Sequence, residues 1–296
     1  MFADILKLLE ENSTVLIFLI SLLGLFVGSF LNVVIFRLPL RLQHEWRTEC
    51  KEFLDVDESS LESLDTPPGN LFTTRSHCPQ CNHQITALEN VPVFSYLLLR
   101  GKCSECSARI SARYPAIEIL TAVLSGLVAW SFGYTAALPF VLILVWSLVA
   151  LSFIDFDHKL LPDKLVYPIL WLGLLVNSQN MLTDVYSALY GAIAGYLVLW
   201  FVYQGFKLLT GKEGMGYGDF KLLALIGAWL GWQMLPLVVL LSSLVGAVVG
   251  ILGILILGRD KQLPIPFGPY LSVAALIALF WGQKIIDSYL QFACIQ

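Results

Sequence analysis

Two aspartates at the edges of apolar segments are the first sign of chemistry in this sequence. Asp155 stands in FIDFDHKLLPD, residues 153–163, at the end of a long apolar run. Asp219 stands in GMGYGDFK, residues 214–221, where another apolar run begins. An ionisable group in such a position is costly and commonly functional. Two carboxylates that share one proton can serve as a base for water and as an acid for a carbonyl or a leaving amine.

Three interpretations of these acids compete: an aspartic peptidase in a membrane, a proton or cation relay in a transporter, and two unrelated interfacial acids. A transporter is expected to bury charge near the membrane midplane, often within inverted repeats, and no internal repeat of fixed period is visible here. Asp157 is the nearest rival of Asp155, whereas Asp163 is expected to be an N-cap or a first-turn acid of the next helix. Glycines at 214, 216 and 218 are expected to permit unusual backbone geometry and close helix approach.

Four cysteines form a second constellation in a polar segment. They are spaced C-x-x-C, then 21 residues, then C-x-x-C, as Cys78, Cys81, Cys103 and Cys106. This spacing predicts a structural zinc site closed by four thiolates, with no open position for catalysis. Two disulfides are the alternative, which a cytosolic location disfavours. The neighbouring His77 and His83 could substitute as ligands, but with four cysteines present they are expected to be surface groups or to lie just outside the ligand shell.

The composition predicts that these residues belong to an all-α integral membrane protein. Hydrophobic residues make up 57% of the 296 residues and charged residues only 14%. Apolar runs of spanning length lie at roughly 14–36, 116–133, 138–155, 185–208, 234–257 and 268–290. Shorter runs at roughly 163–177 and 219–232 bring the expected number of transmembrane helices to about eight. The runs are continuous, so a membrane β-barrel is excluded.

Charge placement predicts the orientation of the chain. Of its 18 lysines and arginines, 16 fall in alternate connections between the predicted spans, so that side is expected to be cytosolic. The start MFADILKLLEENS lacks a basic region, and no cleaved signal peptide is expected. The formal net charge of −4 and the absence of a basic stripe give no indication of a nucleic-acid partner.

The predicted spans divide the chain into three parts. Residues 1–37 form a first transmembrane helix, residues 38–114 a cytosolic zinc-binding loop domain, and residues 115–296 a membrane domain of seven helices. The first half of the loop domain is acidic and reads as a short helical excursion or a loose insertion. Both predicted chemical sites therefore lie on the cytosolic side.

In several motifs, taken in order, the chain resembles the type IV prepilin peptidases, bifunctional enzymes of pilus assembly and type II secretion in the bacterial inner membrane. The resemblance rests on GSFLNVVIFRLP, the paired C-x-x-C motifs, RYPAIEILTA, D-x-D-H-x-x-L-P-D, G-x-G-D and PFGPYL. It implies that Asp155 and Asp219 are the catalytic pair. It also implies that the basic leader of prepilins and pseudopilins is cleaved after a glycine at the cytosolic face of the membrane.

The resemblance further implies that the new amino terminus is N-methylated with S-adenosylmethionine. Gly101 and Lys102 match positions that the family ties to methylation, although a simple turn is the alternative for them. Ser29, Asn32 and Arg37 could line either site, and helix packing is the simpler explanation for the first two. Glu118, inside the second predicted span, could pair with a basic group or assist methyl transfer. Two other functions stay open, a proton-coupled transporter with a zinc-knuckle regulatory loop and a membrane scaffold.

Overall fold

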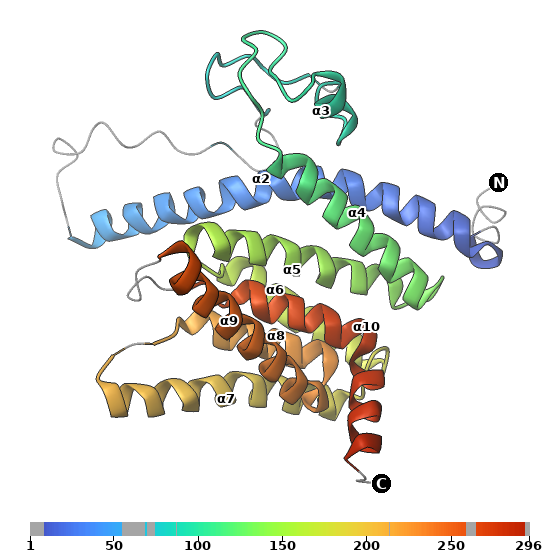
Figure 1. Cartoon of the computed structure of the whole chain (residues 1–296), viewed down its shortest axis with the longest axis vertical. Coiled ribbons are helices and arrows are strands. Elements are labelled where there is room, and N and C mark those ends of the chain that lie inside the picture. Colours follow the sequence, from blue (N-terminus) through green and yellow to red (C-terminus); the bar gives the residue numbers. More distant parts are fainter. Residues whose placement is uncertain are drawn as a thin grey trace. The chain divides into compact units, whose positions relative to one another are not determined.

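The computed structural model of the chain is helical and describes residues 9–54, 69, 75–86, 88–212, 214–258 and 265–293. Its α-helices are α2 (Ser13–Leu54), α3 (Phe94–Leu98), α4 (Arg113–Phe132), α5 (Leu138–His158), α6 (Asp163–Ser178), α7 (Val185–Thr210), α8 (Tyr217–Leu230), α9 (Leu235–Leu257) and α10 (Gly268–Phe292) (Figure 1). A short 3-10 helix, η2 (Trp232–Met234), precedes α9. The described residues contain two isolated β-bridges and no strand, so the predicted all-α class is confirmed.

Six helices of the described part are long and apolar enough to cross a membrane, and this confirms a multi-pass membrane protein. They are α2, α4, α5, α7, α9 and α10. The two shorter predicted spans also form helices, α6 with 16 residues and α8 with 14. At 1.5 Å per residue these are about 24 and 21 Å long, short of the roughly 30 Å hydrocarbon core. The number of eight spans therefore stays a prediction.

The chain folds as two compact units, Met1–Tyr134 and Thr135–Gln296. In the first unit α2 and α4 approach closely through small residues. A Cβ added to Gly28 of α2 would lie 2.7 Å from Glu118 Cα of α4. Helix α2 continues past Pro39 to Leu54, so the first part of the acidic segment is helical. The rest of that segment lies outside the described residues. The boundaries proposed at 37 and 114 stay predictions.

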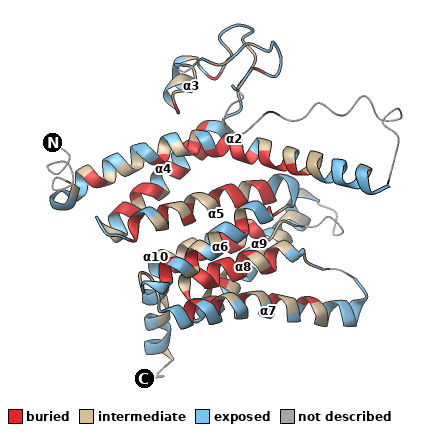
Figure 2. Cartoon of the chain, turned by 180° about the vertical axis from the view of Figure 1, so that it is seen from behind, coloured by how far each residue is buried: buried red, intermediate tan, exposed pale blue. Residues whose placement is uncertain are grey.

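The second unit is built around α8, which is buried along most of its length (Figure 2). Helices α6, α7, α9 and α10 all contact α8. Glycines of α7 allow a close approach to α8: a Cβ added to Gly191 would lie 2.3 Å from Gly227 O, and one added to Gly195 would lie 2.5 Å from Leu223 O. The far end of α8 is held by Asn177 of α6, which is fully buried and whose Nδ2 donates to Ala228 O (2.9 Å) and Trp229 O (3.0 Å). The C-terminal end of α8 is therefore fixed by amide hydrogen bonds, and its middle packs directly on the backbone of α7.

Helices of this unit begin and end at residues suited to those positions. Helices α5, α9 and α10 each carry a proline in the first two helical positions, where its missing N–H costs nothing. Asp184 caps α7 by accepting the N–H of Ser187 (2.9 Å). Helix α5 ends at Lys159, whose left-handed backbone closes the turn directly after the acidic stretch.

Candidate functional site

The structure brings Asp155 and Asp219 together. Asp155 lies in the last turn of α5 and Asp219 in the first turn of α8, and they are 5% and 8% exposed. Their carboxyl groups are close enough for direct electrostatic interaction. Asp157, the rival for the first position, is exposed. Two buried acids from distant parts of the sequence thus form a pair at the ends of two helices.

Two contacts hold the stretches that carry these aspartates against each other. A Cβ added to Gly218 would lie 2.9 Å from Leu161 Cβ, so only glycine lets the turn after α5 approach α8 this closely. Lys221 of α8 donates to Asp163 Oδ1 at 2.8 Å and lies 5.3 Å from the ring centre of Tyr167. Asp163 is the first residue of α6, which confirms the expected first-turn position. Its ion pair with Lys221 was not predicted.

A backbone N–H fixes the carboxylate of Asp155. Gly268, the first residue of α10, donates its N–H to Asp155 Oδ2 at 2.9 Å. A Cβ added to Gly268 would lie 2.7 Å from the same oxygen, so a larger residue there must displace it. The motif PFGPYL contains this glycine. The motif was visible in the sequence, but its contact with Asp155, 113 residues away, was not.

The three glycines before Asp219 have different environments. A Cβ added to Gly214 would lie 2.8 Å from the ring of Phe206, so Gly214, like Gly218, allows a close approach. Gly216 has φ −80° and ψ 146°, which any residue adopts. No atom of the described residues lies within 4 Å of a Cβ built on it. The expectation that all three glycines serve packing or unusual geometry is therefore wrong for Gly216.

The four cysteines of the first unit form a compact cluster suited to one metal ion. Their sulfur atoms all lie within 4.8 Å of one another. Cys78 Sγ is 3.8 Å from Cys106 Sγ, and Cys81 Sγ is 3.9 Å from Cys103 Sγ. Sulfurs placed tetrahedrally at 2.3 Å from a zinc ion lie about 3.8 Å apart, whereas a disulfide requires about 2.05 Å. The cysteines are free, and their arrangement fits zinc.

The two C-x-x-C segments are structural duplicates, offset by 25 residues. In the first segment, the N–H of Cys78 donates to His83 O and the N–H of Asn82 donates to Cys78 O. In the second segment, the N–H groups of Cys103 and Ser107 make the two equivalent hydrogen bonds. Asn82 and Ser107 share the same left-handed backbone, each with φ +57°. An antiparallel bridge closes each segment, His77 with Gln84 and Lys102 with Arg109. This repeat was missed in the sequence because the aligned segments have only their cysteines in common.

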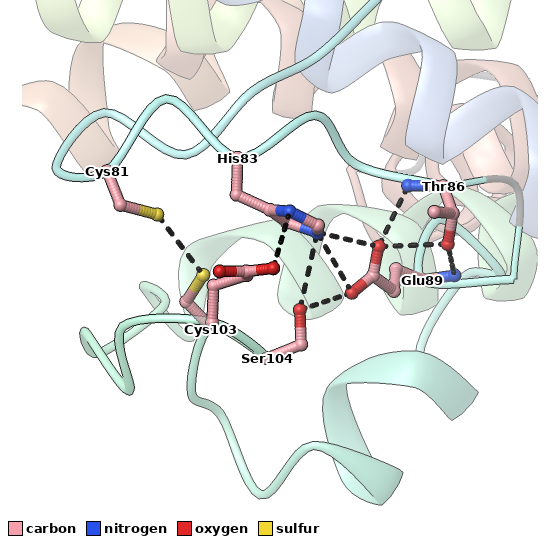
Figure 3. Close-up of polar contacts among 7 residues, drawn as sticks. Cys81, His83, Thr86, Glu89, Cys103 and Ser104 are labelled. Carbon is pink, nitrogen blue, oxygen red and sulfur yellow. Dashed lines mark hydrogen bonds and ion pairs between the residues drawn. The ribbon is translucent and has the colours of Figure 1, made fainter.

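Glu89 links the two duplicated segments through polar contacts (Figure 3). Its Oε2 accepts the N–H and the hydroxyl of Thr86, each at 2.8 Å, and Oε1 accepts the hydroxyl of Ser104. His83 Nε2 lies 3.3 Å from Oε2, and His83 Nδ1 lies 3.7 Å from Glu105 Oε1. The hydrogen bonds from Ser104 and Thr86 lower the pKa of Glu89 to about 2. This confirms His83 as a neighbour of the cysteines outside the sulfur cluster.

The residues predicted for methyl transfer are found in turns and contacts that fold the first unit. Gly101 has φ +67°, and its added Cβ would lie 2.9 Å from Tyr96 Oη. Lys102, beside it, has an exposed side chain. Glu118 is buried and accepts the N–H of Val93 at 2.8 Å, where a β-branched residue has the strained φ of +60°. Glu118 therefore ties this unit's loop to α4.

Residues of α2 also serve packing in this unit. Ser29 hydrogen-bonds to Glu118, and Asn32 Nδ2 donates to Tyr114 O at 3.2 Å. Arg37 Nη2 donates to Arg75 O at 3.5 Å, a long bond at the beginning of the loop. These contacts join α2, α4 and the loop. They agree with helix packing as the simpler explanation for Ser29 and Asn32.

Comparisons with known proteins match both units. Residues 22–132 match the family model described as the bacterial peptidase A24 N-terminal domain, and residues 142–251 match the type IV leader peptidase family. A protein of Stutzerimonas stutzeri named prepilin leader peptidase/N-methyltransferase is 53% identical over 97% of this chain and 98% of its own length. Proteins with the same name from Pseudomonas aeruginosa and Aeromonas hydrophila are 53% and 56% identical over 92% of this chain and 92% and 93% of theirs. No solved structure matches.

Proposed function

We propose a function from the premise that this chain belongs to the type IV leader peptidase family. It removes the basic leader of prepilins and pseudopilins and then N-methylates the new amino terminus. One observation carries the peptidase half: the buried pair of Asp155 and Asp219, at the end of α5 and the start of α8. The relatives' shared name supports both halves. No finding favours a transporter or a scaffold.

In the peptide cleavage, the aspartate pair activates water and protonates the leaving amine. The N–H of Gly268 stabilises a charged carboxylate at Asp155, so we assign the base to Asp155 and the acid to Asp219. Asp155 takes a proton from water, which attacks the carbonyl carbon, while Asp219 donates its proton to the carbonyl oxygen. Collapse of the tetrahedral intermediate breaks the C–N bond: Asp155 passes its proton to the leaving amine, and Asp219 recovers its proton from a hydroxyl of the intermediate as the carboxyl group forms.

The location of the pair matches the location of the substrate bond. A basic leader stays in the cytosol of the bacterium, while the apolar helix that follows it enters the inner membrane. The bond between them lies at the membrane edge, where α5 ends and α8 begins. The charge distribution of this chain supports a cytosolic position for that edge.

The methyl transfer is assigned to the first unit. When bound, S-adenosylmethionine supplies the methyl group to the free amine. Zinc would be held by Cys78, Cys81, Cys103 and Cys106 and would keep the loop folded without taking part in the chemistry. Gly101 has no side chain that could contact a methyl donor, and its role is to shape the turn. The exposed ammonium group of Lys102 is suited to pair with the carboxylate of the donor.

Mass spectrometry of a prepilin substrate tests this proposal directly. Purified wild type in lipid is expected to remove the leader and, with S-adenosylmethionine, to add one methyl mass. Asp155→Asn and Asp219→Asn are each expected to lower the rate of cleavage at least about 10⁴-fold, because the two carboxyl groups act together and each variant removes one of them. The matched control Asp157→Asn is expected to retain cleavage. Cleavage that survives in both dyad variants would refute the aspartic mechanism.

A further inference from the structure

The short helix α3 of the first unit presents an exposed apolar face. Its residues Phe94, Leu97 and Leu98 are 60%, 65% and 84% exposed, and no residue of the helix is buried (Figure 2). Residues three and four positions apart are neighbours on a helix, so these three side chains lie on one side of α3. A single exposed apolar residue is common on a protein surface, but a continuous apolar face indicates an interaction site.

The opposite side of α3 packs on the loop that follows it. A Cβ added to Gly101 would lie 2.9 Å from Tyr96 Oη, and the N–H of Gly101 donates to Tyr96 O at 2.9 Å. Tyr96 follows Phe94 by two positions and therefore points to the other side of the helix. The loop thus fixes the orientation of α3, with its apolar face directed outwards.

A hydrogen bond to α4 sets the level at which α3 begins. Helix α4 has 20 residues and is about 30 Å long, as long as the hydrocarbon core that it is apolar enough to cross. Glu118 comes five residues after Arg113, the first residue of α4, and so lies about 7.5 Å along the helix. Val93, directly before α3, donates its N–H to Glu118 Oε2 at 2.8 Å. Helix α3 therefore begins below the level at which α4 enters the bilayer.

Basic residues gather at the other end of α3. Arg100, Lys102 and Arg109 are exposed, and we call them the basic cluster. The N–H of Lys102 donates to Leu99 O, directly after α3, and a β-bridge pairs Lys102 with Arg109. Positive charge beside an apolar face is suited to a bilayer with anionic phospholipids. The basic leader of a prepilin would be repelled by the same charges.

We propose that α3 inserts its apolar face, Phe94, Leu97 and Leu98, into the leaflet at which α4 begins, with the basic cluster on anionic phospholipid headgroups. Interfacial helices bury their apolar face about 5–10 Å into the boundary between headgroups and acyl chains, and the level set by Glu118 agrees with this depth. The inference depends on neither of the two proposed activities. It adds a lipid-binding surface to the loop that carries the four cysteines.

Depth-dependent fluorescence quenching in the full-length protein tests this inference. The bilayers contain phosphatidylethanolamine and phosphatidylglycerol, with bromine atoms in the upper part of the acyl chains as quenchers. A fluorescent amino acid replaces Leu98 or, as the matched control, Gln80, which is exposed in the first cysteine segment. The label at position 98 is expected to lose much more of its fluorescence than the label at position 80, because only the former reaches the acyl chains.

A second pair of variants separates insertion from simple proximity to the bilayer. In the protein labelled at position 98, Leu97→Asp is expected to remove most of the quenching, since a carboxylate is costly in lipid. Leu97→Met, which keeps an apolar side chain, is expected to retain it. Unchanged protection of the loop amides from hydrogen exchange shows that each variant is folded.

The outcomes distinguish lipid from other occupants of this face. Quenching at position 98 that is no stronger than at position 80, or that persists in folded Leu97→Asp, would overturn the proposal. A label that becomes shielded only after a prepilin substrate is added would also overturn it, because α3 would then dock the substrate. In bilayers of phosphatidylcholine alone the quenching is expected to weaken, and unchanged quenching there would refute the role of the basic cluster.

Discussion

Gly268, through its backbone N–H, is as important for the geometry of the aspartate pair as the two acids themselves. Asp155 is buried at a helix end, where its orientation depends on the few groups that reach it. Gly268 contributes both a donor and the absence of a side chain. A substitution there changes where the carboxylate points while leaving its chemistry intact.

Gly268→Ala is therefore expected to lower kcat about 100-fold with little change in KM, because misplacing a reacting group by about 1 Å has an effect of that size. Cleavage kinetics with a prepilin substrate measure it. Gly205→Ala is the control, since a Cβ on Gly205 meets nothing within 4 Å. An unchanged kcat in Gly268→Ala would mean that the N–H contact does not position Asp155 during turnover.

Glu89 gives the cysteine loop a pH dependence with a defined sign. Its pKa is about 2 in the folded loop and 4.5 in an unfolded chain. A lowered pKa stabilises the folded loop fully above pH 4.5, and this stabilisation is lost as the pH falls toward 2. Glu89→Gln is expected to expose the amide of Thr86 to faster hydrogen exchange at pH 7. The difference from wild type is expected to shrink between pH 4.5 and 2; a difference that persists at pH 2 would contradict the assignment.

At the scale of helices, the ion pair of Lys221 with Asp163 joins the start of α8 to the start of α6. Lys221 and Asp163 are 23% and 51% exposed, and an exposed pair of this kind contributes at most about 1 kcal/mol. The charge reversal Lys221→Glu is expected to lower cleavage several-fold by repelling Asp163. The double variant with Asp163→Lys is expected to recover most of the activity. No recovery in a folded double variant would show that Lys221 acts in another way.

A substitution in the close contact between α7 and α8 is expected to have a larger effect on stability and cleavage than the loss of this ion pair. A side chain at Gly195 must push α8 away from α7, and overpacking of this kind typically costs about 1–3 kcal/mol. Gly195→Leu is expected to lower the Tm and to abolish cleavage, because α8 carries Asp219. Gly205→Leu, on the same helix in open space, is expected to do neither. Thermal unfolding monitored in detergent and the cleavage assay distinguish the two variants.

For the molecule as a whole, the two units separate metal dependence from the aspartate chemistry. The cysteines lie in the first unit and both aspartates in the second. Removal of the proposed zinc ion with a chelator is expected to unfold the cysteine loop and to reduce methylation while leader cleavage continues. Mass spectrometry of one substrate reads both activities. Equal loss of the two at low chelator concentration would show that the metal loop also supports cleavage.

The sequence was sufficient for the parts of this architecture that local patterns encode. Apolar run length predicted the six long helices, and motif position predicted which acids would meet. Contacts between distant segments were not predictable, since one sequence contains no signal that links Gly268 to Asp155 or Lys221 to Asp163. The duplication of the cysteine segments was hidden for a related reason: backbone bonds and left-handed turns define it, and these are compatible with several residue types.

The duplicated cysteine segments make the metal site a cross-link between two halves, each of which offers only two of the four ligands. The affinity for the proposed zinc ion must therefore include the entropic cost of closing the intervening chain, and this cost grows slowly with the length of that chain. Doubling that connection would weaken binding by only about 0.6 kcal/mol, a factor of roughly 3. A longer connection between the two segments would thus be compatible with binding of the same proposed ion.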